Sequence, residues 1–174
     1  ALESTFAFGL NDLWGENKID RMELARVGQR TEHKYIGVMC GIMDQAISCL
    51  GRKGSLLRLD CRSGEYEYFP WNPKGYQLVL VNSCVKHTLA GSPYNERRLQ
   101  CEHVAEIIGQ KHPEVKSLRD ASIEMLEEVK GEITGDEYKR ARYVIGEVER
   151  VLAVCDALKN DDYEMVGKMM YETH

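Results

Sequence analysis

The nine residues Gly37-Val38-Met39-Cys40-Gly41-Ile42-Met43-Asp44-Gln45 constrain this chain more than any other stretch. Two glycines bracket a turn, and the apolar residues after the turn predict a helix. Asp44 lies in the first turn of that helix among apolar neighbours. A carboxylate in this place, near oriented backbone N–H groups, is a candidate catalytic base. The alternative is an acid that only stabilises a helix N-terminus, and this stretch alone leaves both interpretations open.

Composition narrows the class of protein. With 174 residues, the chain is long enough for one large or two small domains with a sizeable core. Its net charge of −5 argues against a nucleic-acid binder, which needs a basic face. No apolar run approaches the roughly 18 residues that span a bilayer, and no secretory signal is visible. We therefore expect no nucleic-acid partner and no membrane association.

The cysteines indicate a reducing compartment. Six are scattered along the chain without a C-x-x-C pair, and they are Cys40, Cys49, Cys61, Cys84, Cys101 and Cys155. This pattern is typical of free thiols in the cytosol, so we expect a cytoplasmic protein. Cys101 and His103 are close in sequence but lack the second ligand pair of a zinc site.

The first half of the chain predicts helices followed by a hairpin. A helix over residues 1–13 would carry Leu2, Phe6, Leu10 and Leu13 on one face, and it has no N-cap residue, so we expect a preceding segment. Further helices are expected over 20–33 and from Asp44 to near Gly51. Residues 55–59 and 65–69 predict a β-hairpin around the turn 61–64. The apolar run 76–82 predicts a central, buried strand.

The second half predicts helices. One spans 94–112 and ends before Pro113, and another spans 118–130. Thr134 and Glu137 form a predicted capping box at the start of a long helix, whose apolar stripe runs from Ala141 to Leu158. A last helix covers 162–170. The mixture of few strands and many helices indicates an α+β fold.

A second group of motifs makes the chain resemble a known family. Asn82-Ser83-Cys84-Val85-Lys86-His87 and Ser92-Pro93 precede the string YNERRLQCE (94–102), while LDCRS (59–63) and ARYVIGEVERV (141–151) lie on either side. Together with CGIMDQ (40–45), these strings are similar in order and spacing to those of the galactokinases, sugar kinases of the GHMP superfamily. The resemblance covers nearly the whole chain.

The resemblance implies the two-lobed GHMP kinase fold. Residues 1–54 would be the helical part of the N-terminal lobe, and 55–174 would belong mostly to the C-terminal lobe, with the boundary between about residues 51 and 76. The family's galactose motif and its Gly-Leu-Ser-Ser-Ser phosphate loop would precede Ala1, and its glycine-rich motif would follow His174. We therefore expect a central segment of a longer protein. Ala46 stands where the family often has a bulky aromatic residue.

The resemblance also implies a reaction, the ATP-dependent phosphorylation of α-D-galactose at its C1 hydroxyl with Mg²⁺. Asp44 would take the hydroxyl proton, Gly41 and Tyr94 would contact the sugar, and Glu32 would hold Mg²⁺. From the residues alone, Glu32 is equally a surface acid. Gly41 could simply shape the turn, and Tyr94 could be a partly buried aromatic, although the YNERR context favours the sugar contact. The adjacent Arg97-Arg98 pair favours ion pairs with nearby glutamates over phosphate binding.

Three other readings stay open at this stage. The same scaffold could serve a non-catalytic sensor of galactose and nucleotide, a related N-acetylgalactosamine kinase, or a complete, non-catalytic remnant. We expect a monomer with galactose and ATP as its ligands, and a segment that is inactive alone because it lacks the phosphate loop. Sugar specificity and oligomeric state are not readable from these residues.

Overall fold

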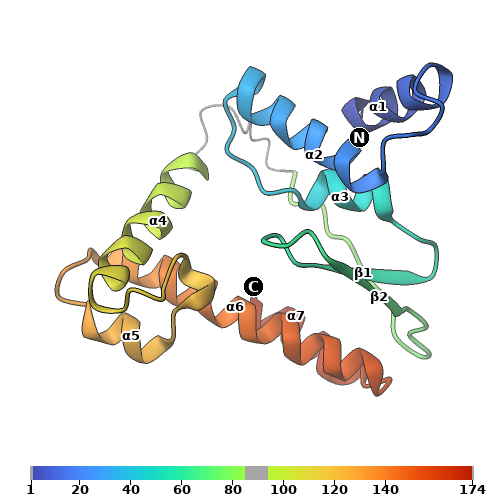
Figure 1. Cartoon of the computed structure of the whole chain (residues 1–174). Helices are drawn as coiled ribbons and strands as arrows, with labels where there is room; N and C mark the ends of the chain where they lie inside the picture. The colour runs from blue at the N-terminus through green and yellow to red at the C-terminus, as the bar shows by residue number, and fades with distance from the viewer. Residues whose placement is uncertain (1, 85–93, 174) are drawn as a thin grey trace. The chain divides into compact units, whose positions relative to one another are not determined.

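The computed structural model describes residues 2–84 and 94–173, which divide into two compact units, Ala1–Ala90 and Gly91–His174 (Figure 1). Each unit is described by itself. Residues 85–87 and 92–93 of the quoted motifs lie outside the described residues, and so does His174. The chain has helices and a small antiparallel sheet, so the predicted α+β class is confirmed.

The first unit is built on three α-helices, α1 (Leu2–Leu13), α2 (Arg21–Thr31) and α3 (Met43–Leu50). Asp20 caps α2, because its carboxylate accepts hydrogen bonds from the backbone N–H groups of Met22 (2.9 Å) and Glu23 (3.0 Å). A π-helical turn, η1 (Glu32–Ile36), continues α2 and leads into the loop before α3. The core of this unit consists of Met22, Leu24, Ala25, Ile42, Ala46, Cys49 and Leu50.

The predicted hairpin is confirmed and packs against these helices. Strands β1 (Ser55–Leu59) and β2 (Tyr66–Pro70) pair antiparallel, with Leu57 opposite Tyr68. Leu57 and Leu59 pack on the core, and the Tyr68 hydroxyl donates to the Leu50 carbonyl at 2.6 Å. The hairpin therefore lies in the same compact unit as residues 1–54, and this unit runs to Ala90. The assignment of residues to the two kinase lobes stays a prediction.

The prediction of a buried strand over residues 76–82 is wrong for this structure. The segment is not part of a strand, and Leu80 and Val81 are 91% and 85% exposed. Among the described residues, β1 and β2 form a two-stranded sheet without a third neighbour. An apolar sequence can favour extended backbone, but a strand also needs a neighbouring strand for its hydrogen bonds. The predicted apolar face of α1 is likewise exposed, with Leu2 at 73% and Phe6 at 64%.

The second unit contains α4 (Tyr94–Lys111), η2 (Leu118–Asp120), α5 (Ile123–Glu128), α6 (Gly135–Lys159) and α7 (Tyr163–Thr173). Its core consists of apolar residues of α4, η2, α5 and α6, together with Val115 and Val129, which lie between elements. They are Val104, Ala105, Ile107, Ile108, Val115, Leu118, Leu126, Val129, Ala141 and Ile145. The predicted end of α4 before Pro113 is confirmed.

The single helix predicted over residues 118–130 is wrong in one respect, because the segment divides into the 3₁₀ turn η2 and the short helix α5. The Asp120 carboxylate accepts the Ser117 N–H at 3.1 Å and closes the first turn. Ser122 then caps α5 by accepting the Met125 N–H at 3.3 Å. Serine and aspartate side chains compete with helical backbone bonds in this way.

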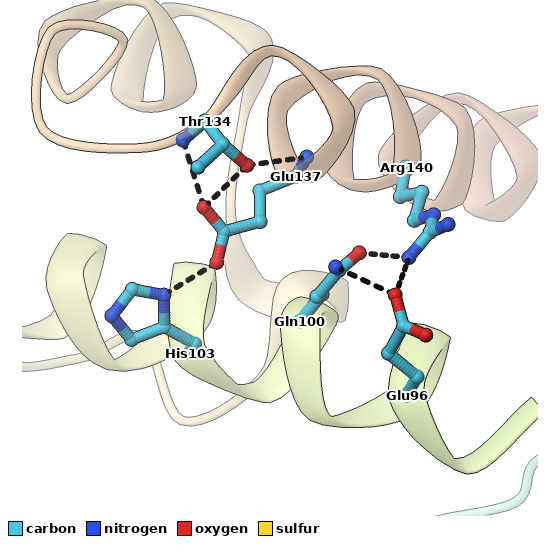
Figure 2. Close-up of polar contacts among 6 residues, drawn as sticks. All are labelled: Glu96, Gln100, His103, Thr134, Glu137 and Arg140. Carbon is cyan, nitrogen blue, oxygen red and sulfur yellow. Dashed lines mark hydrogen bonds and ion pairs between the residues drawn. The ribbon is translucent and has the colours of Figure 1, made fainter. Parts of the chain in front are cut away.

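The capping box predicted at the start of α6 is confirmed, and it is linked to α4 (Figure 2). The Glu137 carboxylate accepts the Thr134 N–H at 2.8 Å, and the Thr134 hydroxyl accepts the Glu137 N–H at 3.3 Å. The other carboxylate oxygen of Glu137 lies 2.7 Å from His103 Nδ1 on α4. Hydrogen bonds from Thr134, and then from His103, lower the pKa of Glu137 to about 2.

A second polar contact lies one turn along the same two helices (Figure 2). Gln100 on α4 donates to Glu96 at 3.2 Å and accepts from Arg140 on α6, which also lies 3.6 Å from Glu96. Arg98 pairs with Glu102 at 2.8 Å, which agrees with the structural interpretation of that arginine. These contacts fix the helix register where the apolar core ends.

Helix α6 has 25 residues and is amphipathic over part of its length. Ala141 and Ile145 are buried near its start, and Cys155 and Leu158 near its end, but Val151 and Leu152 are about half exposed. The predicted apolar stripe is therefore only partly buried. Among the described residues, no helix is both long and apolar enough to cross a membrane.

We predict that Glu137 makes folding sensitive to acid. Its folded-state pKa of about 2 is below the ordinary value of 4.5, so its stabilisation is complete above pH 4.5 and is lost as the pH falls toward 2. The whole effect is on the order of 3 kcal/mol. When urea unfolding is measured at a series of pH values, Glu137→Gln should lose less unfolding free energy between pH 4.5 and pH 2 than the wild type. Glu164→Gln, in the first turn of α7, is the control and should keep the wild-type slope. Equal slopes for all three proteins would contradict the assignment.

Candidate active-site loop

The loop before α3 is shaped by a glycine and held against α2. Gly37 ends the π-helical turn with a φ of +78°, a left-handed conformation that favours glycine, and its N–H donates to the Glu32 carbonyl at 2.9 Å. Val38, the next residue, is buried. The loop therefore begins at a defined point and packs inward at once.

The carbonyl of Cys40 is the main polar anchor of the loop. It accepts a hydrogen bond from Gln29 Nε2 at 3.3 Å and lies 2.8 Å from His33 Nε2. Because a carbonyl oxygen only accepts, His33 carries a proton on Nε2 in this contact. Burial raises the pKa of the Cys40 thiol, and the negative charge of Glu32 adds to this effect. Two side chains from the end of α2 and from η1 thus hold the backbone that precedes Gly41.

Asp44 is the second residue of α3, and its side chain is exposed. The helix lacks a side-chain cap at Ile42, so its first N–H groups and its dipole favour a negative charge at this end. Met43 and Ile47 beside Asp44 are also exposed, at 72% and 47%. The carboxylate can therefore reach a ligand above the helix end, where it could accept a hydrogen bond or a proton from a hydroxyl group.

Glu32 and Gly41 flank this loop in different surroundings. Glu32 is half-buried at the first position of η1. In the described part of the chain, no three His, Cys, Asp or Glu side chains cluster as a metal site, so Glu32 offers a single carboxylate. Gly41 is exposed, and a Cβ added there would meet no atom within 4 Å.

A hollow of about 290 Å³ lies between α2 and the hairpin turn, with Gly41 on its wall. Arg26, Arg30 and Arg62 also line it, and Glu23 pairs with Arg30 at 2.8 Å and with Arg26 at 3.7 Å. Asp44 does not line this hollow. The structure therefore brings Gly41 and Asp44 together on one loop and helix end, but it does not place them in one cavity.

Tyr94 lies in the second unit, at the first residue of α4, with its side chain 40% exposed. Its predicted contact with the sugar stays a prediction.

Gln45 is a residue that the sequence reasoning missed. It is buried, and it lies on the same face of α3 as Ala46 and Cys49. Helical spacing carries this signal, because positions 42, 45, 46 and 49 share one face and only Gln45 among them is an amide. A polar residue on an apolar face merits attention because buried amides need partners.

Comparisons with known proteins agree with the motifs. Residues 1–52 match the family model of the GHMP kinases N terminal domain. A galactokinase of Thermotoga petrophila is 39% identical over 174 residues, which cover 100% of this chain and 47% of that protein. A galactokinase of Homo sapiens is 41% identical over 150 residues, covering 86% of this chain and 37% of the relative.

A solved structure gives the same result for the fold. The crystal structure of Lactococcus lactis galactokinase complexed with galactose matches with a TM-score of 0.88 at 31% identity, covering 99% of this chain and 44% of that chain. The resemblance to the galactokinases is confirmed. The chain spans about half the length, or less, of the relatives that it matches.

The two glycines of this loop are expected to differ in their sensitivity to substitution by alanine. Gly37→Ala should lower the free energy of unfolding by about 1 kcal/mol, because alanine resists the left-handed φ of +78°. Gly41→Ala should change stability by less than about 0.5 kcal/mol, because its Cβ enters open space. Denaturant unfolding of both variants checks this. A strongly destabilised Gly41→Ala would mean that this glycine is needed to shape the loop.

Proposed function

We propose that this chain is part of a galactokinase, which transfers the γ-phosphoryl group of ATP to the C1 hydroxyl of α-D-galactose and yields galactose 1-phosphate. The observation that supports this most is the exposed carboxylate of Asp44 at the start of α3, directly after the anchored Cys40-Gly41 backbone. The galactokinases that match over the whole chain, and the relative solved with galactose, support the choice of sugar.

In this proposal Asp44 orients the C1 hydroxyl and accepts its proton. Phosphoryl transfer passes through a loose transition state in which positioning and charge stabilisation contribute most of the catalysis. A carboxylate is a weak base, but the hydroxyl loses its proton late in such a reaction. The positive end of the α3 dipole favours a negative charge at this helix end, where the carboxylate would face the acceptor hydroxyl.

Glu32 would provide the protein ligand for Mg²⁺. The ion prefers hard oxygen ligands and keeps several waters, so one carboxylate together with ATP phosphate oxygens is sufficient. A half-buried carboxylate beside the Asp44 loop fits this requirement. When bound, the ion neutralises charge on the phosphates. Gly41 and Tyr94 would contact the sugar, through close backbone approach and through an aromatic face.

The nucleotide phosphates need a cradle of backbone N–H groups. Residues 1–174 do not contain the Gly-Leu-Ser-Ser-Ser string that performs this task in the family. We therefore propose that the segment by itself does not transfer phosphate, and that the activity requires a polypeptide that also carries this loop. A monomer in the cytoplasm, with galactose and ATP as ligands, completes the proposal.

A sensor of galactose and nucleotide is the alternative, because every feature of the loop described above serves binding as well as transfer. Galactose binding without formation of sugar phosphate in the complete protein would favour the sensor. Preference for N-acetylgalactosamine in the same assay would favour the related kinase.

We predict that Asp44→Asn in the complete protein lowers kcat by at least about 1,000-fold while galactose still binds, because an amide cannot take the hydroxyl proton. Phosphate transfer and galactose titration measure the two effects. Asp136→Asn is a matched control, because Asp136 is also the exposed second residue of a helix, α6. Unchanged turnover of Asp44→Asn would contradict the proposed role.

We predict that Glu32→Gln raises the Mg²⁺ concentration for half-maximal activity by at least on the order of 10-fold, a loss that even outer-shell partners of a metal can cause. Mg²⁺ titrations of turnover and of nucleotide binding both measure this. Glu106→Gln, an exposed acid on α4, is the control. An identical Mg²⁺ dependence for the two variants would assign Glu32 to the surface.

A further inference from the structure

Gln45 is the buried polar contact between α3, α1 and the loop. Gln45 is only 5% exposed, and its Nε2 donates a hydrogen bond to the Glu3 carboxylate on α1 at 3.3 Å. The same nitrogen lies 4.0 Å from the sulfur of Cys40, the residue whose carbonyl is held by Gln29 and His33. The Cys40 segment is therefore held on one side from α2 and η1 and on the other side from α3.

Gly28 on α2 makes the space for this contact. A Cβ added at Gly28 would lie 3.0 Å from Cγ of Gln45 and 3.4 Å from the Glu3 carboxylate. The three helices thus meet where α2 has no side chain. Any larger residue there would push Gln45 or Glu3 aside.

The chemistry of Glu3 determines the orientation of the Gln45 amide. An ionised carboxylate only accepts hydrogen bonds, so the NH₂ group faces Glu3 and the amide oxygen faces away. Within the described part of the chain, that buried oxygen has no hydrogen-bond partner. A buried amide with an unpaired oxygen is a poor choice for stability alone. The contacts with Glu3 and Cys40 fix this amide directly after Asp44 in the sequence.

We propose that Gln45 is a positioning residue for Asp44, acting through its hydrogen bond to Glu3 and its contact with Cys40. Neighbouring residues on a helix point about 100° apart, so the inward anchor at Gln45 sets the direction of the outward carboxylate of Asp44. The expected effect on catalysis rests on the proposed function. The anchoring of residues 37–44 can be measured whether or not the proposed function is correct.

The test uses the complete protein and exchanges the two partners. Gln45→Glu places two carboxylates together, whereas the double variant Glu3→Gln, Gln45→Glu restores one donor and one acceptor in reversed order. Gln77→Glu makes the same chemical change at an exposed glutamine and is the control. Amide hydrogen exchange of residues 37–44, kcat and KM for galactose, and the unfolding temperature are measured for each protein.

We expect Gln45→Glu to exchange faster over residues 37–44 and to lose on the order of 100-fold in kcat, the effect of a misplaced catalytic group. KM should change by no more than about threefold. The double variant should recover protection and most of the lost kcat, and Gln77→Glu should match the wild type. If Gln45 has only a structural role, the variants should differ in unfolding temperature, and the double variant should not restore kcat. That result would overturn the inference.

Two further outcomes are separable. If Gln45→Glu does not fold, Glu3→Ala removes only the acceptor, and a loss of about 10-fold in kcat with faster exchange is then expected. An unchanged Glu3→Ala would overturn the inference. If the wild-type protein shows no galactose phosphorylation, the proposed function fails. Amide exchange of residues 37–44 then tests the anchoring by itself. Loss of protection in Gln45→Glu and its recovery in the double variant would support the anchoring.

Discussion

The close approach of α2 and α3 at Gly28 is the contact on which the first unit depends. Without a side chain at this position, the two helices approach closely enough to bury Gln45 and to bring Glu3 of α1 into the same contact. The loop that connects η1 to α3 must then follow a short, defined path. Its Cys40 carbonyl lies where Gln29 and His33 can hold it. The exposure of Asp44 follows from this packing, since the other face of α3 is occupied.

In the second unit a charged side chain, Glu137, makes the polar contact between helices that the buried amide of Gln45 makes in the first unit. Glu137 closes the capping box of α6 and reaches His103 on α4, so one carboxylate stabilises a helix end and a helix–helix contact together. The low pKa of Glu137 has its origin in these donors. Apolar packing around Val104, Ile108 and Ala141 supplies the bulk of the stability.

Local signals predicted most elements of this fold. The capping box at Thr134, the hairpin and the end of α4 before Pro113 all depend on residues close in sequence, and each is found. The exposed run at residues 76–82 shows where such signals stop. Its apolar residues indicate extended backbone, but a strand exists only when another segment supplies hydrogen bonds. The division of 118–130 arose from serine and aspartate bonds that compete with a continuous helix.

By itself, the sequence determined the fold class, the placement of Asp44 in the first turn of a helix, and the resemblance to galactokinases, because these depend on spacing and on residue order. Only the tertiary structure decided that Asp44 is exposed and that Gln45 is buried against Glu3, and it placed the hairpin on the helices of the first unit. The partners in those contacts are up to 42 residues apart. Local sequence patterns carry no information about which distant side chain fills the space beside a glycine.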